Sequence, residues 1–278
     1  MAVDRYAVFG HPISHSKSPL IHALFAKQTG QKIAYTAQDV PPGCLEVAVR
    51  VFHAGGGRGL NLTLPLKELG YQLVQELTPR AQLAGSVNTI FWQDETLCGD
   101  NTDGVGLIRD LTANLGLTLT GKRILILGAG GAARGIVGPL LEQKPAFLVI
   151  ANRTLARAQE LGERFAVLGK ISVTSFADLA GKHFDLILNA TSASLHGELP
   201  PLPEGLIAKG GCCYDLMYAD RPTAFVRWGL EHGAIISADG LGMLVEQAAE
   251  AFYIWRGVRP ETAPVIWQLR ADADKKTV

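Results

Sequence analysis

KRILILGAGGAARG, residues 122–135, is the stretch that decides the fold of this 278-residue chain. Its apolar first half is typical of a buried parallel strand, and the glycine-rich turn that follows opens into IVGPLLEQ, which favours a helix. The turn fits the pattern G-x-G-x-x-A at Gly128, Gly130 and Ala133. The first glycine makes the tight turn, the second lets the backbone approach a pyrophosphate, and the small third residue lets helix and strand pack closely. The stretch therefore predicts a dinucleotide-binding strand–helix–strand unit.

Short apolar strands and helical segments alternate through the rest of the chain. In the C-terminal half the predicted strands are AFLVIAN (146–152), ISV (171–173), DLILNA (185–190), CCYDL (212–216) and AIIS (234–237). In the N-terminal third they are YAVFG (6–10), IAYTAQDV (33–40) and GLNLTL (59–64), followed by a hairpin in TIFWQDETLCGD (89–100). Such alternation predicts parallel strands covered by helices. We therefore expect two α/β domains, with a boundary after Asp103.

Composition narrows the class of protein. The 26 acidic and 26 basic residues cancel, and 47% of the chain is hydrophobic. This is the composition of a folded globular protein, and its neutral balance argues against nucleic acid or an anionic membrane as partner. No uncharged apolar run reaches membrane-spanning length, and the start MAVDRYAVFG has no apolar signal core. None of the four cysteines forms a C-x-x-C pair. We expect a cytoplasmic protein with free thiols, no metal site and a small-molecule partner.

The end of the second strand of the dinucleotide unit indicates which cofactor binds. NAD sites usually carry an acid there, about 20 residues after the glycines, to bind the ribose 2′-hydroxyl. This chain has Asn152, Arg153 and Thr154 instead, with Arg157 one helical turn further on. A guanidinium pairs with a 2′-phosphate, which a carboxylate would repel. Thr154 is also a natural N-cap for the next helix, but capping does not account for the missing acid. We therefore expect NADP rather than NAD.

Polar residues gather at the predicted strand ends of the N-terminal third. Each alone is an ordinary cap or turn residue. Together they are many polar groups at the ends of strands in a small α/β domain, which is where open sheets bind ligands. They are Asn61, Thr63, Lys67, Asn88, Asp100, Asn101, Thr102 and Asp103.

At these stretches the sequence resembles the shikimate dehydrogenase family, from about Tyr6 to Arg256. The matching stretches are GHPISHSKSP, NLTLPLK, SVNTI, GDNTDG, GAGGAARG, ANRT, NATS, YDLMY and GLGMLVEQAAEAF. The resemblance implies substrate-binding residues Ser14, Ser16, Asn61, Thr63, Lys67, Asn88, Asp103, Tyr218 and Gln247. It implies cofactor-binding residues Gly128, Ala129, Gly130, Gly131, Ala132, Asn152, Arg153, Thr154, Arg157 and Met243. Tyr218 and Met243 would stand at the edges of the cleft.

The resemblance also implies an architecture and a reaction. Residues 1–103 and 240–278 would form a mixed-sheet substrate domain completed by the C-terminal helices, and residues 104–239 a Rossmann domain for NADP. The reaction implied is the reversible NADPH-dependent reduction of 3-dehydroshikimate to shikimate, a step toward chorismate and the aromatic amino acids. Quinate or dual quinate/shikimate dehydrogenase activity, and a non-catalytic ligand-sensing homologue, are the alternatives. A monomer and a homodimer are both open.

One loop departs from the family pattern. After NATS the family usually continues with a small residue and glycine, whereas this chain reads ASLHGELPPLP from Ala193. The resemblance places this loop near the nicotinamide.

The resemblance gives the SHSKSP stretch (14–19) a role, since shikimate carries a carboxylate. If the segment is extended, Ser14 and Ser16 point the same way, and both hydroxyls can donate to that carboxylate without a buried cation. Ser14-x-x-Lys17 also matches the S-x-x-K of β-lactamases, but no S-D-N or K-T-G partner follows. We assign Lys17 no role.

Lys67 and Asp103 suit the proton transfer that accompanies hydride transfer at a secondary alcohol. Alone, Lys67 reads as a surface lysine and Asp103 as a helix cap. Paired sites titrate jointly, so the sequence does not decide which of them holds the transferred proton. We assign Lys67 as the acid/base and Asp103 as its positioning partner.

Overall fold

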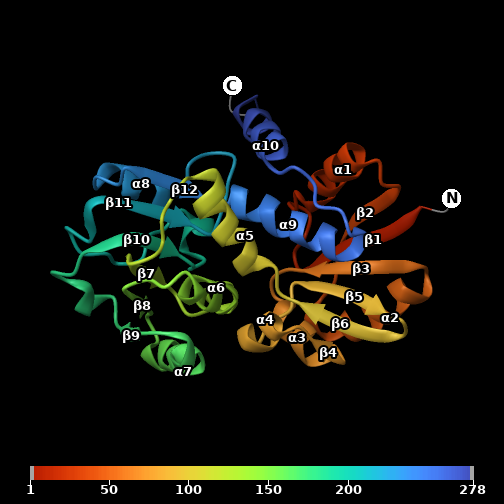
Figure 1. Cartoon of the computed structure of the whole chain (residues 1–278), viewed down its shortest axis with the longest axis horizontal. Coiled ribbons are helices and arrows are strands. Elements are labelled where there is room, and N and C mark those ends of the chain that lie inside the picture. Colours follow the sequence, from red (N-terminus) through yellow and green to blue (C-terminus); the bar gives the residue numbers. More distant parts are fainter. Residues whose placement is uncertain (1–2, 276–278) are drawn as a thin grey trace. The chain divides into compact units, whose positions relative to one another are not determined.

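Two six-stranded sheets organise the chain, each with its own helices (Figure 1). The structure is a computed structural model that describes residues 3–275, with the side chains of Leu195, His196 and Asp274 outside the description. By contacts, one compact unit extends to Gly106 and includes Val245–Val265. The other consists of Leu107–Leu244 and the described residues from Ile266 on. The domain boundaries predicted from the sequence, with 240–278 in the first domain, stay a prediction.

The first unit contains a mixed sheet in the order β2-β1-β3-β5-β6-β4. Its strands are β1 (Asp4–Gly10), β2 (Ile33–Asp39), β3 (Gly57–Leu62), β4 (Glu76–Leu77), β5 (Thr89–Gln93) and β6 (Thr96–Asp100). Its helices are α1 (Ser18–Thr29), α2 (Leu45–Ala54), α3 (Lys67–Leu73) and α4 (Pro79–Ala84), with most of α9 (Leu241–Arg256). Strand β1 runs parallel to β2 and β3, and β5 is antiparallel to both β3 and β6.

The second unit contains a fully parallel sheet in the order β12-β11-β10-β7-β8-β9. Its strands are β7 (Arg123–Leu127), β8 (Phe147–Ala151), β9 (Ile171–Thr174), β10 (Phe184–Asn189), β11 (Ile207–Asp215) and β12 (Ile236–Asp239). Its helices include α6 (Gly131–Glu142), α7 (Leu155–Phe165) and α8 (Ala224–Glu231), with α5 (Asp103–Arg109) leading in and most of α10 (Ala263–Lys275). The strand order reverses between β7 and β10, which is the Rossmann switch point. The predicted fold class is confirmed.

Each sheet buries an apolar core of its own. Phe9, Leu60 and Ile90 lie fully buried in the first unit, and Leu125, Ile187 and Phe225 in the second. The central strands β7, β8 and β10 of the second sheet are buried on both faces over most of their length, which is why their sequences read as continuous apolar runs. Among the described residues, no helix combines the length and the apolar character needed to cross a membrane.

Local structure differs from the sequence prediction at the first helix. Ser14 and His15 form a turn, closed by a bond from the Ser16 backbone N–H to the Ile13 carbonyl at 3.0 Å. The prediction that Ser14 and Ser16 alternate along an extended segment is therefore wrong. The helix begins at Ser18, with Pro19 in its first turn.

The predicted hairpin at 89–100 is confirmed. Strands β5 and β6 pair antiparallel from Thr89↔Asp100 to Gln93↔Thr96. Asp94 in the connecting turn has φ 54°, the left-handed region that tight hairpin turns require and that aspartate tolerates.

Candidate active site

Lys67 and Asp103 meet at one edge of the first sheet. Lys67 is the first residue of α3, after β3, and Asp103 is the first residue of α5, after β6. Because β3 and β6 are both antiparallel to the strand between them, they run the same way and their carboxyl ends share an edge. There the Lys67 ammonium Nζ donates to Asp103 Oδ2 at 2.6 Å. The lysine side chain is 20% exposed and the aspartate 7%, so the pair is shielded yet reachable.

Asn88 lies just before β5, and its side chain hydrogen-bonds to several residues at this edge of the sheet. Its amide Nδ2 donates to Asp103 Oδ1 at 2.8 Å, to Thr102 Oγ1 at 2.9 Å and to Gln247 Oε1 at 3.2 Å. Its Oδ1 accepts from the Thr102 backbone N–H at 2.8 Å and from Thr89 Oγ1 at 2.9 Å. The amide therefore holds one oxygen of the Asp103 carboxylate while Lys67 takes the other.

A second layer fixes the loop that carries Asp103. Arg80 forms a two-pronged bond to Asp100, from Nε to Oδ1 at 2.6 Å and from Nη2 to Oδ2 at 2.7 Å. Asp100 Oδ1 also accepts from the backbone N–H of Asn101 at 2.6 Å. Asn101 Oδ1 in turn accepts from the backbone N–H of Asp103 at 3.1 Å. Planar guanidinium–carboxylate pairs of this kind fix geometry well.

Asn61 joins the same edge from β3. Its Nδ2 donates to the Asn88 carbonyl at 3.1 Å and to Thr89 Oγ1 at 3.2 Å, and its Oδ1 accepts from the Tyr35 hydroxyl at 2.7 Å. Burial raises the pKa of Tyr35 well above its ordinary value, so the phenol keeps the proton it donates. The sequence does not indicate Tyr35 as a site residue. It shows only a tyrosine, an aromatic side chain with a hydroxyl, within the predicted strand 33–40.

Ser14, Ser16 and Thr63 lie outside the hydrogen-bonded group around Asn88, as far as the described residues show. They stand in the loops after β1 and β3, which are neighbouring parallel strands, so these loops leave the sheet side by side. The Thr63 backbone N–H donates to the Phe9 carbonyl at 2.9 Å. Ser14 is exposed, whereas Ser16 is half-buried and accepts from the Ser18 backbone N–H at 3.3 Å.

The glycine turn lies in the second unit, between β7 and α6. Gly128 has φ 101°, which demands glycine, and a Cβ built there would stand 3.1 Å from Thr191. A Cβ built at Gly130 meets nothing within 4 Å. Gly130 is the N-cap of α6 and makes no side-chain capping bond. No side-chain hydrogen bond caps the start of this 12-residue helix, and the N–H groups at an uncapped helix start suit a pyrophosphate.

The segment after β8 carries the predicted 2′-phosphate residues. Arg153 and Arg157 are both exposed, and within residues 3–275 no carboxylate is paired with either guanidinium. Thr154 occupies the N-cap position of α7 but makes no side-chain capping bond. Asn152 Nδ2 bonds to the Thr154 carbonyl at 2.8 Å, which shapes the loop. The donors present therefore fit the extra phosphate of NADP.

The remaining predicted residues are divided between the units. Gln247 belongs to the first unit and accepts from Asn88, as described above. Tyr218 and Met243 belong to the second. Tyr218 is half-buried, and the buried Met243 donates from its backbone N–H to the Tyr214 hydroxyl at 3.3 Å. No group of three or more His, Cys, Asp or Glu side chains in the described part of the chain is placed to hold a metal ion.

Three family models match the chain in order. The shikimate dehydrogenase substrate binding domain matches residues 8–90, and the shikimate / quinate 5-dehydrogenase model matches residues 110–196. The shikimate 5′-dehydrogenase C-terminal domain matches residues 240–270. The three matches therefore cover parts of both sheets and most of helices α9 and α10.

Relatives and solved structures agree with these matches over nearly the full length. Shikimate dehydrogenase (NADP(+)) from Methylococcus capsulatus is 62% identical over 97% of this chain and 97% of its own. A crystal structure of an Ael1 enzyme from Pseudomonas putida has a TM-score of 0.89 at 46% identity, covering 96% of this chain and 98% of its own. A shikimate 5-dehydrogenase from Thermus thermophilus, in complex with NADP(H) and shikimate, has a TM-score of 0.86 at 33% identity over 99% and 100%. The chain therefore belongs to the shikimate dehydrogenase family.

Proposed function

We propose that this protein is an NADP-dependent shikimate dehydrogenase, which catalyses the reversible reduction of 3-dehydroshikimate to shikimate in the shikimate pathway. The observation that carries the proposal is the Lys67–Asp103 contact of 2.6 Å, held by Asn88 at the sheet edge. A paired ammonium and carboxylate that is mostly buried but still accessible can act as a general acid and base at a substrate oxygen. Relatives with this name cover nearly the whole chain.

The cofactor would be held by the second unit. The turn Gly128–Ala132 and the start of α6 would take the pyrophosphate, and Asn152, Arg153, Thr154 and Arg157 the 2′-phosphate end. The buried Met243 would border the nicotinamide. When bound, NADPH supplies a hydride for the substrate carbonyl carbon.

The proton step falls to the first unit. As the carbonyl oxygen gains negative charge, the Lys67 ammonium donates a proton to it, and the lysine regains a proton from solvent through its exposed side. Asp103 holds the ammonium in place between turnovers. The oxidation of shikimate runs these steps in reverse: Lys67 first releases a proton to solvent, and its neutral amine then accepts the hydroxyl proton. Asn88 keeps the Asp103 carboxylate in a fixed orientation in both directions of the reaction, since its amide donates to the second carboxylate oxygen, Oδ1.

The substrate carboxylate would bind near Ser14 and Ser16. Because these residues form a turn, their hydroxyls do not converge by strand alternation, and the half-buried Ser16 is the better placed donor. Asn61, Thr63, Gln247 and Tyr218 would complete the substrate contacts, with Asn61 oriented by Tyr35.

Domain roles and the setting of the protein are part of the proposal. The first unit would be the substrate domain and the second the NADP domain. A cytoplasmic protein that acts as a monomer or homodimer, with neither nucleic acid nor membrane as partner, would suit a small-molecule dehydrogenase of this kind. The neutral charge balance supports this, since nucleic-acid binding relies on an excess of basic residues.

A four-way assay tests the function. Purified protein is given shikimate or quinate, each with NADP or NAD, and reduction of the cofactor is followed by absorbance. Shikimate with NADP should give by far the highest kcat/KM, and Lys67→Ala should abolish most of it. Equal turnover of quinate would make the protein a dual enzyme. No turnover with any pair, in protein that binds shikimate, would support the ligand-sensing alternative.

A further inference from the structure

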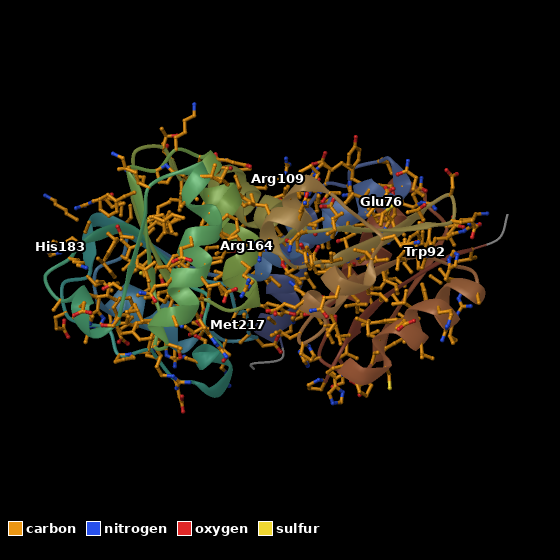
Figure 2. The ribbon with its side chains drawn as sticks, turned by 90° about the horizontal axis from the view of Figure 1, so that it is seen from below. Glu76, Trp92, Arg109, Arg164, His183 and Met217 are labelled. Carbon is orange, nitrogen blue, oxygen red and sulfur yellow. The ribbon has the colours of Figure 1, made fainter. Side chains whose placement is uncertain are left out.

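A fully buried carboxylate stands at the carboxyl end of β11, in the second unit. Asp215 has no exposed surface, and four groups donate to it. Oδ1 accepts from Asn189 Nδ2 and from the Met217 backbone N–H, both at 3.1 Å, and Met217 is labelled in Figure 2. Oδ2 accepts from Ser194 Oγ and Thr223 Oγ1, both at 2.6 Å. Burial raises the pKa of Asp215, and the four donors oppose that shift.

One of these donors lies in the loop that departs from the family pattern, and another ends the strand that leads into it. Asn189 ends β10, and Ser194 lies in the single 3₁₀ turn Ala193–His196 that follows. Asn189 Nδ2 also donates to Ser194 Oγ at 3.2 Å, and Asn189 Oδ1 accepts from Thr191 Oγ1 at 2.7 Å. The hydroxyl of Ser194 is therefore the link between the outer part of this loop and the buried carboxylate.

The same loop lies directly on the glycine turn. The backbone N–H of Ala190 donates to the carbonyl of Leu127 at 2.8 Å, one residue before Gly128. A Cβ built at Gly128 would stand 3.1 Å from Thr191 Cγ2 and 3.2 Å from the Ala190 backbone. The path of the loop therefore decides what packs against one side of the glycine turn.

We propose that Ser194, through Asp215, is a positioning residue for the cofactor: it holds loop 190–197 in the conformation in which the loop and the glycine turn together accept NADP. The proposal rests on the cofactor site proposed above. Without the Ser194 hydroxyl, the outer loop loses its strongest tie to the sheet, because charge-assisted bonds are about twice as strong as neutral ones. Free protein then spends less time in the competent conformation, and the apparent affinity falls by that fraction.

Thr223 supplies a matched control. It donates to the same oxygen of Asp215 at the same distance, but it belongs to the start of α8, where its Oγ1 also accepts from the Val226 backbone N–H at 3.2 Å. Ser194→Ala and Thr223→Val each remove one donor from Asp215 Oδ2. Only the first releases loop 190–197. Ser194→Thr, which keeps a hydroxyl, serves as the conservative rescue.

Hydrogen exchange in the cofactor-free protein is the first readout. The backbone N–H groups of Gly197 and Glu198 bond to the Ser194 and Ala193 carbonyls, at 3.2 and 3.0 Å. In Ser194→Ala these two amides should exchange about tenfold faster, the scale of one lost hydrogen bond. In Thr223→Val they should keep the wild-type rate, and the amide of Val226 should speed up instead.

Calorimetric titration with NADP is the second readout. Ser194→Ala should bind about fivefold more weakly, as expected if roughly a fifth of the free protein stays competent. Thr223→Val and Ser194→Thr should bind within about twofold of wild type. The KM for shikimate should change little in all three variants.

The outcomes separate this proposal from the one it rests on. Wild-type protein that fails to bind NADP would defeat the cofactor assignment itself. Wild-type binding together with unchanged exchange and affinity in Ser194→Ala would overturn the role of Ser194. Equal losses of affinity in Ser194→Ala and Thr223→Val would also overturn it, because the effect would then belong to Asp215 and overall stability rather than to the loop.

Discussion

Replacing His22 by phenylalanine (His22→Phe) should remove a large part of the acid sensitivity of this fold. His22 lies in α1 with no exposed surface, stacked on Tyr35 with ring centroids 4.1 Å apart and planes 6° apart. Phe25, Phe252 and Trp255 surround it. Within the described residues neither ring nitrogen has a hydrogen-bond partner. Burial lowers the pKa of His22 from 6.5 to about 3, and Asn61 opposes this with a smaller effect.

The sign and size of the effect follow from that shift. The unfolded chain takes up a proton on His22 below pH 6.5, while the folded protein does not until about pH 3. The unfolded state thus binds more protons in this window, so stability falls as the pH falls through it. The slope approaches about 1.4 kcal/mol per pH unit, and the loss between pH 7 and pH 5 is about 2 kcal/mol.

Urea unfolding at pH 7, 6 and 5 measures this loss in wild type and in His22→Phe. Other titrating groups contribute equally to both proteins, so the difference between their unfolding free energies isolates His22. That difference should shift by about 2 kcal/mol in favour of the phenylalanine variant between pH 7 and pH 5. A constant offset from repacking the slightly larger ring does not affect the comparison. Parallel stability curves for the two proteins would refute the assignment of His22 as a buried neutral imidazole.

Four further substitutions test the proposed chemistry. Lys67→Ala should cut kcat by roughly 10² or more, the scale of a lost general acid/base, while NADP binding stays intact. Asp103→Asn should also lower kcat strongly. If the two losses in kcat add in the double variant, the two residues do not act jointly. Ser16→Ala should raise the KM for shikimate more than it lowers kcat, so an unchanged KM in steady-state assays would remove Ser16 from the site. Arg153→Ala should weaken the binding of NADP about tenfold and leave the binding of NAD unaffected, since an exposed charge-assisted contact is worth about 1.5 kcal/mol. Titrations that show equal weakening for both cofactors would contradict a 2′-phosphate site, and so would a wild-type preference for NADP that does not change with salt.

Features that depend on strand direction and local chemistry could be predicted from the sequence. The strand before Gly128 is buried on both faces, so its continuous run of apolar residues is enough to predict β7 and the turn that follows it. Lys67 and Asp103 are expected in one site because each follows a predicted strand end, and the family resemblance pairs them; the structure brings them into contact. Asn88 was expected there as well, since it opens the hairpin whose second strand leads to Asp103.

Features that depend on a particular tertiary contact could not. Tyr35 reaches Asn61 across the intervening strand β1, from 26 residues away in the chain, and nothing local pairs the two. Ser194 and Asp215 are 21 residues apart and meet only because β10 and β11 are neighbours. The Ile13–Ser16 turn replaced the expected extended segment through a single backbone bond, which the residue types there do not specify.

The fixed amide of Asn88 has a consequence for the speed of the reaction. Its donors and acceptors are all engaged before any substrate arrives, so the orientation of the Asp103 carboxylate is settled when the chain folds. A substrate entering such a site meets dipoles that already point the right way, and little motion of the protein has to accompany the proton. The ordering cost is met once in folding and does not recur in each turnover, so reorganisation of this carboxylate adds little to the activation barrier.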